Sequence, residues 1–146
     1  MKLTEHTPET FKQLSPEEAL KVIAQDVLDR IKTGEFIPRR GPMYSVFDPK
    51  TGDHVFPRLN QLRDTPVLHV CVAGAIIASG CKVFTKEEFP VHEVIRQTRS
   101  PDNNDGFLMD MFEQKKVPLE QIMQGIVDGK SPRQQYEELI AASYVY

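Results

Sequence analysis

The apolar residues of the first third of the chain recur at helical spacing. Ser15-Pro16-Glu17-Glu18 is a capping box with a proline in the first turn, and it precedes a run of such residues: Leu20, Ile23, Ala24, Val27, Leu28 and Ile31. Gly34 follows the run directly, and a glycine at this place is typical of a helix end. The pattern therefore predicts an amphipathic helix between Ser15 and Gly34, whereas the polar, unpatterned residues 1–14 predict an irregular N-terminal arm.

A pair of helices is predicted over residues 118–145. Pro118 opens an amphipathic run that ends at Asp128-Gly129, and Ser131-Pro132 caps the next run. Because the link between the two runs is short, we expect an antiparallel helix pair.

The most apolar stretch, Thr65 to Gly80, has two interpretations. Thr65-Pro66 and Gly80 fit the start and the stop of one buried central helix, which is the interpretation that we favour. Within it, Cys71, Gly74, Ala75 and Ala78 would form a stripe of small side chains that a neighbouring helix could approach closely. The alternative is a buried strand over residues 66–72, with the helix starting near Cys71, since this part is rich in β-branched residues.

A small β-hairpin is predicted over residues 43–57. Two short β-favouring runs, Met43 to Phe47 and His54 to Phe56, flank a loop that is rich in turn-forming residues. Before it, prolines make residues 36–42 an extended connector. The fold class predicted from these elements is mainly α (α+β): a single helical domain, residues 1–146, around a central helix at 65–80 with one hairpin.

Composition narrows the classes of protein further. The 146 residues are 40% hydrophobic and 27% charged, with a net charge of −3, which fits one globular domain and gives no general case for binding nucleic acid. The apolar stretches are too short to span a bilayer, the first residues do not resemble a signal peptide, and the two cysteines predict free thiols. We therefore expect a cytoplasmic protein without a membrane interaction; its oligomeric state stays open.

One segment carries a resemblance to a known group of proteins. Val70-Cys71-Val72-Ala73-Gly74-Ala75-Ile76-Ile77-Ala78, preceded by Gly34-Glu35-Phe36-Ile37-Pro38, resembles small bacterial and phage proteins of unassigned activity that have a Cys-Ala-x-Gly-Ala-Leu-Leu helix. The segment from Leu119 to Lys130 is similar to a helix near the C-terminus of those proteins. The resemblance implies an architecture and a bacterial or phage source, and it implies no chemistry.

An enzymatic interpretation depends on Cys71. If a helix begins there, its thiol lies at the positive end of the helix dipole, and His69 or His92 could act as a base in a hydrolase or transferase of small molecules or nucleotides. The alternative is that Cys71 is a small buried core residue. The sequence has no metal-ligand spacing and no nucleotide-binding motif, so we predict neither a metal nor a cofactor.

The interpretation that we favour is a non-enzymatic binding or regulatory protein. Arginines and aromatic residues are interspersed between residues 36 and 63, which is the composition of protein interfaces and of sites for anionic ligands. The predicted partner is a protein or an anionic ligand. The alternative is a solvated hairpin without a partner, in which Asp48, Asp53 and Asp64 neutralise most of the positive charge. The predicted binding residues are Arg39, Arg40, Tyr44, Phe56, Arg58 and Arg63.

Overall fold

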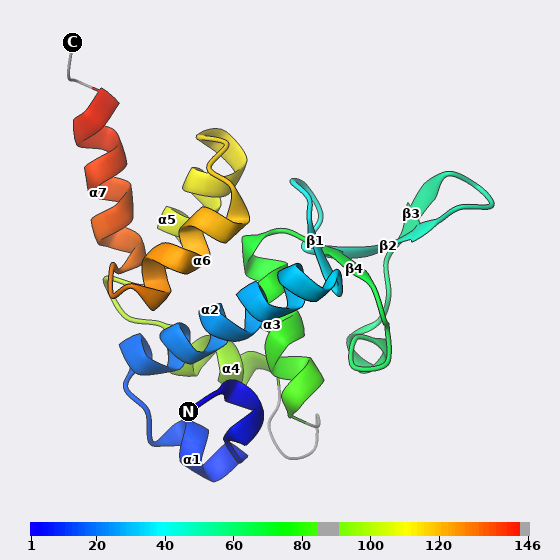
Figure 1. Cartoon of the computed structure of the whole chain (residues 1–146), viewed down its shortest axis with the longest axis horizontal. Helices are drawn as coiled ribbons and strands as arrows, with labels where there is room; N and C mark the ends of the chain where they lie inside the picture. Colours follow the sequence, from blue (N-terminus) through cyan, green and yellow to red (C-terminus); the bar gives the residue numbers. More distant parts are fainter. Residues whose placement is uncertain (85–90, 144–146) are drawn as a thin grey trace.

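The longest described helix, α2 (Pro16–Thr33), begins and ends where the sequence predicts. In the computed structural model, which describes residues 1–84 and 91–143, the Ser15 hydroxyl accepts a hydrogen bond from the Glu18 amide at 3.2 Å. Gly34 ends the helix in the left-handed conformation, with φ of 85°. Helix α2 lies across the middle of the molecule and packs against α3 (Val72–Val83) and α6 (Leu119–Val127) (Figure 1).

Helices make up 58% of the structure, so the prediction of a mainly helical protein is confirmed. Alongside α2, α3 and α6, the described residues form four further α-helices, which are α1 (Pro8–Lys12), α4 (Val91–Thr98), α5 (Asp105–Met109) and α7 (Pro132–Ser143). They also form two 3-10 turns, η1 (Leu3–Glu5) and η2 (Leu59–Gln61), and one π-helical turn, η3 (Asp110–Gln114). The two predicted C-terminal helices are present as α6 and α7 and contact each other. The N-terminal arm is less irregular than predicted, because η1 and α1 bury Leu3 and Phe11 in the core.

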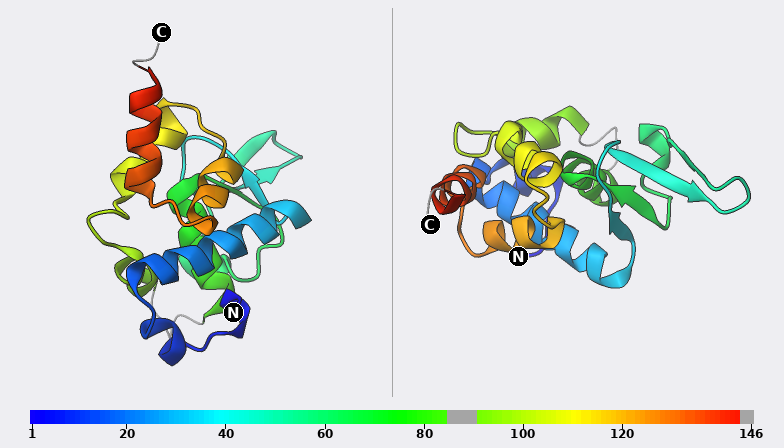
Figure 2. Two further views of the ribbon diagram at one scale, coloured as in Figure 1. Left: turned by 60° about the vertical axis from the view of Figure 1, so that its left-hand side comes forward. Right: turned by 90° about the horizontal axis from the view of Figure 1, so that it is seen from above.

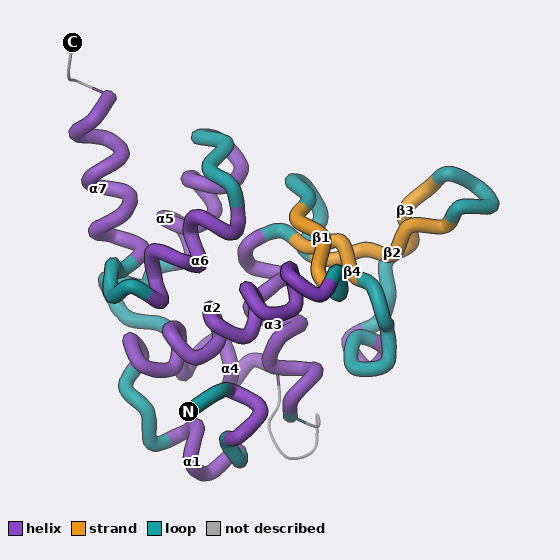
Figure 3. The backbone as a smooth tube through the Cα atoms, in the orientation of Figure 1, coloured by secondary structure: helices purple, strands orange, loops and turns teal. Residues whose placement is uncertain are grey.

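The strands form a four-stranded mixed sheet, which corrects the prediction of a lone hairpin. Their order in the sheet is β1-β4-β2-β3, with bounds β1 (Phe36–Pro38), β2 (Tyr44–Asp48), β3 (Asp53–Val55) and β4 (Leu68–Val70). Strand β4 pairs parallel with β1 and antiparallel with β2. The hairpin predicted from the sequence is the β2–β3 pair, and the sheet lies at one end of the helical body (Figure 3).

The central apolar stretch is part strand and part helix, so the favoured prediction of one helix over 65–80 is wrong. Leu68 and Val70 are buried whereas His69 is half-buried, which is the alternation of a strand with one face in the core. Cys71 then caps α3, and its sulfur accepts a hydrogen bond from the Gly74 amide at 3.5 Å. The alternative interpretation, a strand followed by a helix that starts near Cys71, describes the structure.

Gly74 is the point at which α3 touches the strand connector most closely. The predicted close approach is real, but the neighbour is the backbone of Met43 in the β1–β2 connector rather than another helix. The Met43 carbonyl accepts a hydrogen bond from the Cys71 amide at 3.0 Å, and a Cβ atom on Gly74 would overlap that carbonyl. The first turn of α3 therefore holds the start of β2 in place.

None of the helices that residues 1–84 and 91–143 form is long and apolar enough to cross a membrane.

Candidate functional site

One face of the sheet points away from the helical core, and the strand register shows which residues lie on it. Residues directly opposite each other in neighbouring strands share a face. His69 of β4 lies opposite Ile37 on one side and Ser45 on the other, and Phe47 lies opposite His54. Since Leu68 and Val70 of β4 point into the core, these five residues lie on the outer face.

Four polar residues meet on this outer face, and we call them the outer-face cluster: Arg39, Ser45, His54 and His69. The Ser45 Oγ lies 2.9 Å from His54 Nδ1, and Arg39 Nη1 donates to the same oxygen at 3.5 Å. The rings of His54 and His69 meet edge to face, with centroids 4.9 Å apart. Strand pairing fixes three of the four backbones, so the cluster is held by the sheet itself.

The cluster disfavours a protonated His69. Burial lowers the pKa of His69, and the nearby charges of His54 and Arg39 lower it further. Its Nδ1 atom is buried and has no hydrogen-bond partner among the described residues. Arg39 makes its hydrogen bond to the Ser45 hydroxyl, and no carboxylate in the described ranges forms an ion pair with it.

The second predicted arginine, Arg40, points elsewhere. Its Nε donates to the Phe112 carbonyl at 2.8 Å, and its guanidinium lies over the Phe112 ring, 5.0 Å from the centroid. The next amide, of Gly41, donates to the Glu113 carboxylate at 3.2 Å. Arg40 therefore anchors the connector to η3, and the two adjacent arginines do not form one surface.

The other predicted binding residues lie around the sheet at different depths. Tyr44 is half-buried against the core at the start of β2, where burial, followed by the charge of Cys81, raises its pKa. Phe56 follows β3 directly and is 63% exposed. Arg58 and Arg63 are exposed in the segment that joins β3 to β4.

Large exposed apolar side chains concentrate in the same part of the molecule. Apart from Met1, every such residue in the described ranges lies between positions 37 and 67, on the strands or in the loops that join them. We call these residues the exposed apolar set: Ile37, Met43, Phe47, Val55, Phe56, Leu59 and Val67. The β2–β3 hairpin carries Phe47 and Val55 and extends beyond the helices, as Figure 1 and the right-hand view of Figure 2 show.

The Cys71 residue is poorly placed for nucleophilic chemistry. It is fully buried, and burial raises the pKa of its thiol more strongly than the hydrogen bonds from Gly74 and Ala73 lower it. No hydrogen bond joins it to His69 or His92 in the described part of the chain; His92 is exposed on α4, 3.4 Å from Glu93. This geometry favours the core role of Cys71 over the enzymatic alternative.

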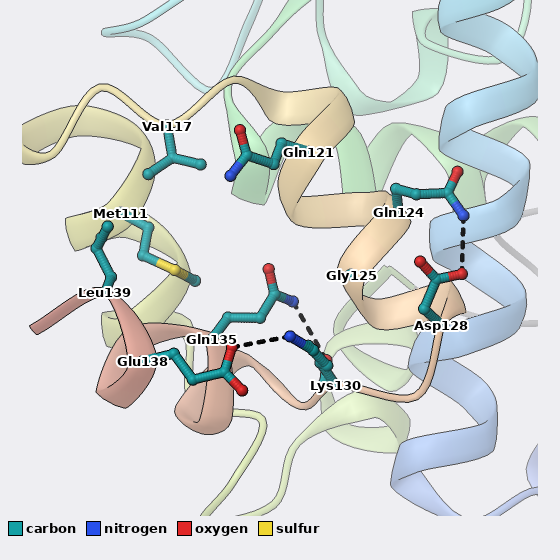
Figure 4. Close-up of a pocket in the computed structure, with 10 residues that line it drawn as sticks. All are labelled: Met111, Val117, Gln121, Gln124, Gly125, Asp128, Lys130, Gln135, Glu138 and Leu139. Carbon is teal, nitrogen blue, oxygen red and sulfur yellow. Dashed lines mark hydrogen bonds and ion pairs between the residues drawn. The ribbon is translucent and has the colours of Figure 1, made fainter. Parts of the chain in front are cut away.

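A concave region lies between α6, α7 and η3. It is a cavity of about 480 Å³ (Figure 4), and its lining is mixed polar and apolar. Several of its polar groups pair with one another: Lys130 with Glu138 at 2.9 Å, and Gln124 with Asp128 at 3.0 Å. Gln135 Nε2 donates to the Lys130 carbonyl and to the Ile122 carbonyl of α6, each at 3.2 Å, so Gln135 joins α7 to α6.

Residues 1–84 and 91–143 do not bring together three or more histidine, cysteine, aspartate or glutamate side chains in an arrangement that could hold a metal ion. Comparisons of the chain with protein-family models, with curated proteins and with solved structures find no match. The resemblance to the bacterial and phage proteins stays a prediction.

Proposed function

We propose that this is a binding protein that recognises a partner protein through residues 37–67, which contain the strands β2 and β3 and which we call the sheet end. The observation that carries the proposal is the exposed apolar set. The helices bury their apolar faces in the core, whereas Phe47, Val55 and Phe56 expose 46%, 53% and 63% of their surface. Exposed apolar side chains that gather in one region are typical of interaction sites, whereas scattered single ones are not.

The backbone of the sheet end also suits an interface. Strand β3 is an outer strand of the sheet, so one row of its peptide groups has no strand partner among the described residues. Such an edge can accept an extended segment of another protein through main-chain hydrogen bonds. The side chains of Val55 and Phe56 would then supply apolar contacts to that segment.

Charge indicates the kind of partner. Residues 37–67 contain five arginine and lysine residues and three aspartates, whereas the whole chain has a net charge of −3. The sheet end is therefore the cationic part of an acidic protein. An acidic segment of a partner would be steered to it, since complementary charge raises association rates.

The prediction is that Phe56→Asp weakens partner binding by about tenfold or more, because an exposed aromatic anchor at the centre of an interface contributes strongly to affinity. The protein would serve as bait in a lysate of its native host, and the affinity of the recovered partner would be measured by calorimetry. Because Phe56 contacts little of the core, the variant should keep the parent melting temperature.

The matched control is Lys21→Glu, which changes an exposed charge on α2, away from the sheet. It should leave the affinity unchanged. If both variants bind the partner as the parent does, the interface lies elsewhere. Light scattering of the purified protein tests whether the partner is a second copy of the same chain. If the parent is a dimer and Phe56→Asp dissociates it, the interface is a dimer contact, and the proposal of a different partner protein is overturned.

A further inference from the structure

We propose that the outer-face cluster of Arg39, Ser45, His54 and His69 is a subsite for a phosphoryl group, either inorganic phosphate or a phosphate monoester. This inference goes beyond the docking function and does not depend on it, because the site would bind a small anion by itself.

The first argument is the combination of donors. Arginine presents a planar set of N–H groups that matches phosphate oxygens, and the two imidazoles add N–H donors that become cationic when protonated. These groups lie within one connected patch: Arg39 Nη1 is 3.5 Å from Ser45 Oγ, which is 2.9 Å from His54 Nδ1, and His54 contacts His69. A tetrahedral dianion could accept from several of them at once.

The second argument is that the charges around the cluster are cationic. The charges that act on His69 are those of His54 and Arg39. The nearest carboxylates along the same strands, Asp48 and Asp53, lie opposite each other, one position beyond the Phe47–His54 pair, and so point to the other face. Glu35, before β1, is already paired with Arg30 at 2.5 Å. None of these three carboxylates therefore neutralises the cluster.

The third argument is protonation. In the free protein burial lowers the pKa of His69 and so favours its neutral form. Stability is therefore lost as the pH falls below the ordinary histidine pKa of about 6.5, where the unfolded chain binds the proton more readily. A bound dianion reverses this preference, because it stabilises the protonated rings. Binding of phosphate and protonation of the cluster must then assist each other.

The experiment is to measure the pKa values of all four histidines by NMR, with and without phosphate, at matched ionic strength. Phosphate should raise the pKa of His69 and change the chemical shifts of the His54 ring. His6, between η1 and α1, and His92, on α4, lie outside the sheet; they are internal controls and should not respond. No response at His54 and His69, or an equal response at all four histidines, would overturn the proposal.

Two variants test the role of the arginine. Arg39→Gln should weaken phosphate binding by about tenfold, as expected for the loss of a charge-assisted contact, whereas Arg96→Gln on the exposed face of α4 should bind as the parent does. If Arg39→Gln fails to fold, His54→Gln serves in its place and should abolish the response of His69. Unchanged phosphate affinity in a folded Arg39→Gln or His54→Gln variant would also contradict the subsite.

Phenyl phosphate separates the two sources of the phosphoryl group. The Phe47 ring is 46% exposed and lies beside His54, with centroids 5.5 Å apart, so it could pack against an apolar group attached to phosphate. Tighter binding of phenyl phosphate than of inorganic phosphate would identify a monoester as the ligand. Equal binding would identify free phosphate, and binding of neither would refute the subsite.

Discussion

Replacing Gly74 with alanine is expected to lower the free energy of unfolding by about 3 kcal/mol or more, the upper end of the cost of overpacking. The added Cβ would overlap the Met43 carbonyl, which is backbone and also accepts the Cys71 amide. The gain in helix propensity, about 1 kcal/mol, is too small to offset a shift of the β1–β2 connector against α3. Urea denaturation of the two proteins measures the difference.

The matched control for Gly74→Ala is Gly125→Ala in α6. There the added Cβ would meet the end of the Gln135 side chain, at 2.6 Å, and a flexible side chain can move. We expect a change within about 1 kcal/mol, because the propensity gain is offset by weakened hydrogen bonds from Gln135. If Gly74→Ala is as stable as the parent, the connector is not packed on α3 as described.

The second large effect is expected at Asp26, which is 8% exposed on α2. Its Oδ2 accepts from Arg30 Nε at 2.7 Å and from the buried Ser79 hydroxyl of α3 at 2.5 Å. Burial alone would lower the pKa of Arg30, but the hydrogen bonds and charges of Asp26, and then of Glu35, raise it. Asp26 therefore joins α2 to α3 and holds Arg30, which also pairs with Glu35 just before β1.

Asp26→Ala should cost about 3 kcal/mol in unfolding free energy, because it leaves the Ser79 hydroxyl buried without its acceptor and removes one partner of Arg30. Asp29→Ala on the same helix removes only a carboxylate that accepts from Gln25, and should cost less than about 0.5 kcal/mol. In the double variant Asp26→Ala with Ser79→Ala, the loss should be smaller than the sum of the two single losses. Additive losses would show that the two side chains do not interact.

The helices could be predicted because their signals are local. The capping box at Ser15 and the left-handed Gly34 bound α2, and both lie within a few residues of the segment that they define. The sheet could not be predicted in the same way. Strands β1 and β4 have three residues each and pair across more than 30 positions of sequence. They are too short to show a periodic pattern, and no tight turn joins them, so their pairing could not be predicted.

The central stretch, Thr65 to Gly80, shows how a short strand can be mistaken for the start of a helix. Leu68-His69-Val70 alternates in burial, but three residues are too few to separate a strand from the start of a helix. The Thr65 hydroxyl, expected to cap a helix, instead donates to the Gln61 carbonyl at 2.7 Å. The β-branched residues of this stretch were the available signal for a strand.

The candidate site was visible in the sequence only in part. Arg39 and Phe56 stand out by their composition, and His69 stands out as a possible base. Ser45 and His54 do not, because their meeting with His69 depends on the register of three strands. Arg40 was grouped with Arg39 because they are adjacent, but successive side chains of an extended chain point in opposite directions.

The most direct test of the docking function is hydrogen exchange of the protein with and without the partner that it recovers. The sheet end and the cavity between α6 and α7 are two candidate binding regions, and they are far enough apart in the sequence for their exchange to be measured separately. We predict slower exchange in residues 37–67, with the strongest protection in β3 and at Phe56. Protection confined to residues 117–139, with no change across the strands, would contradict the proposed function.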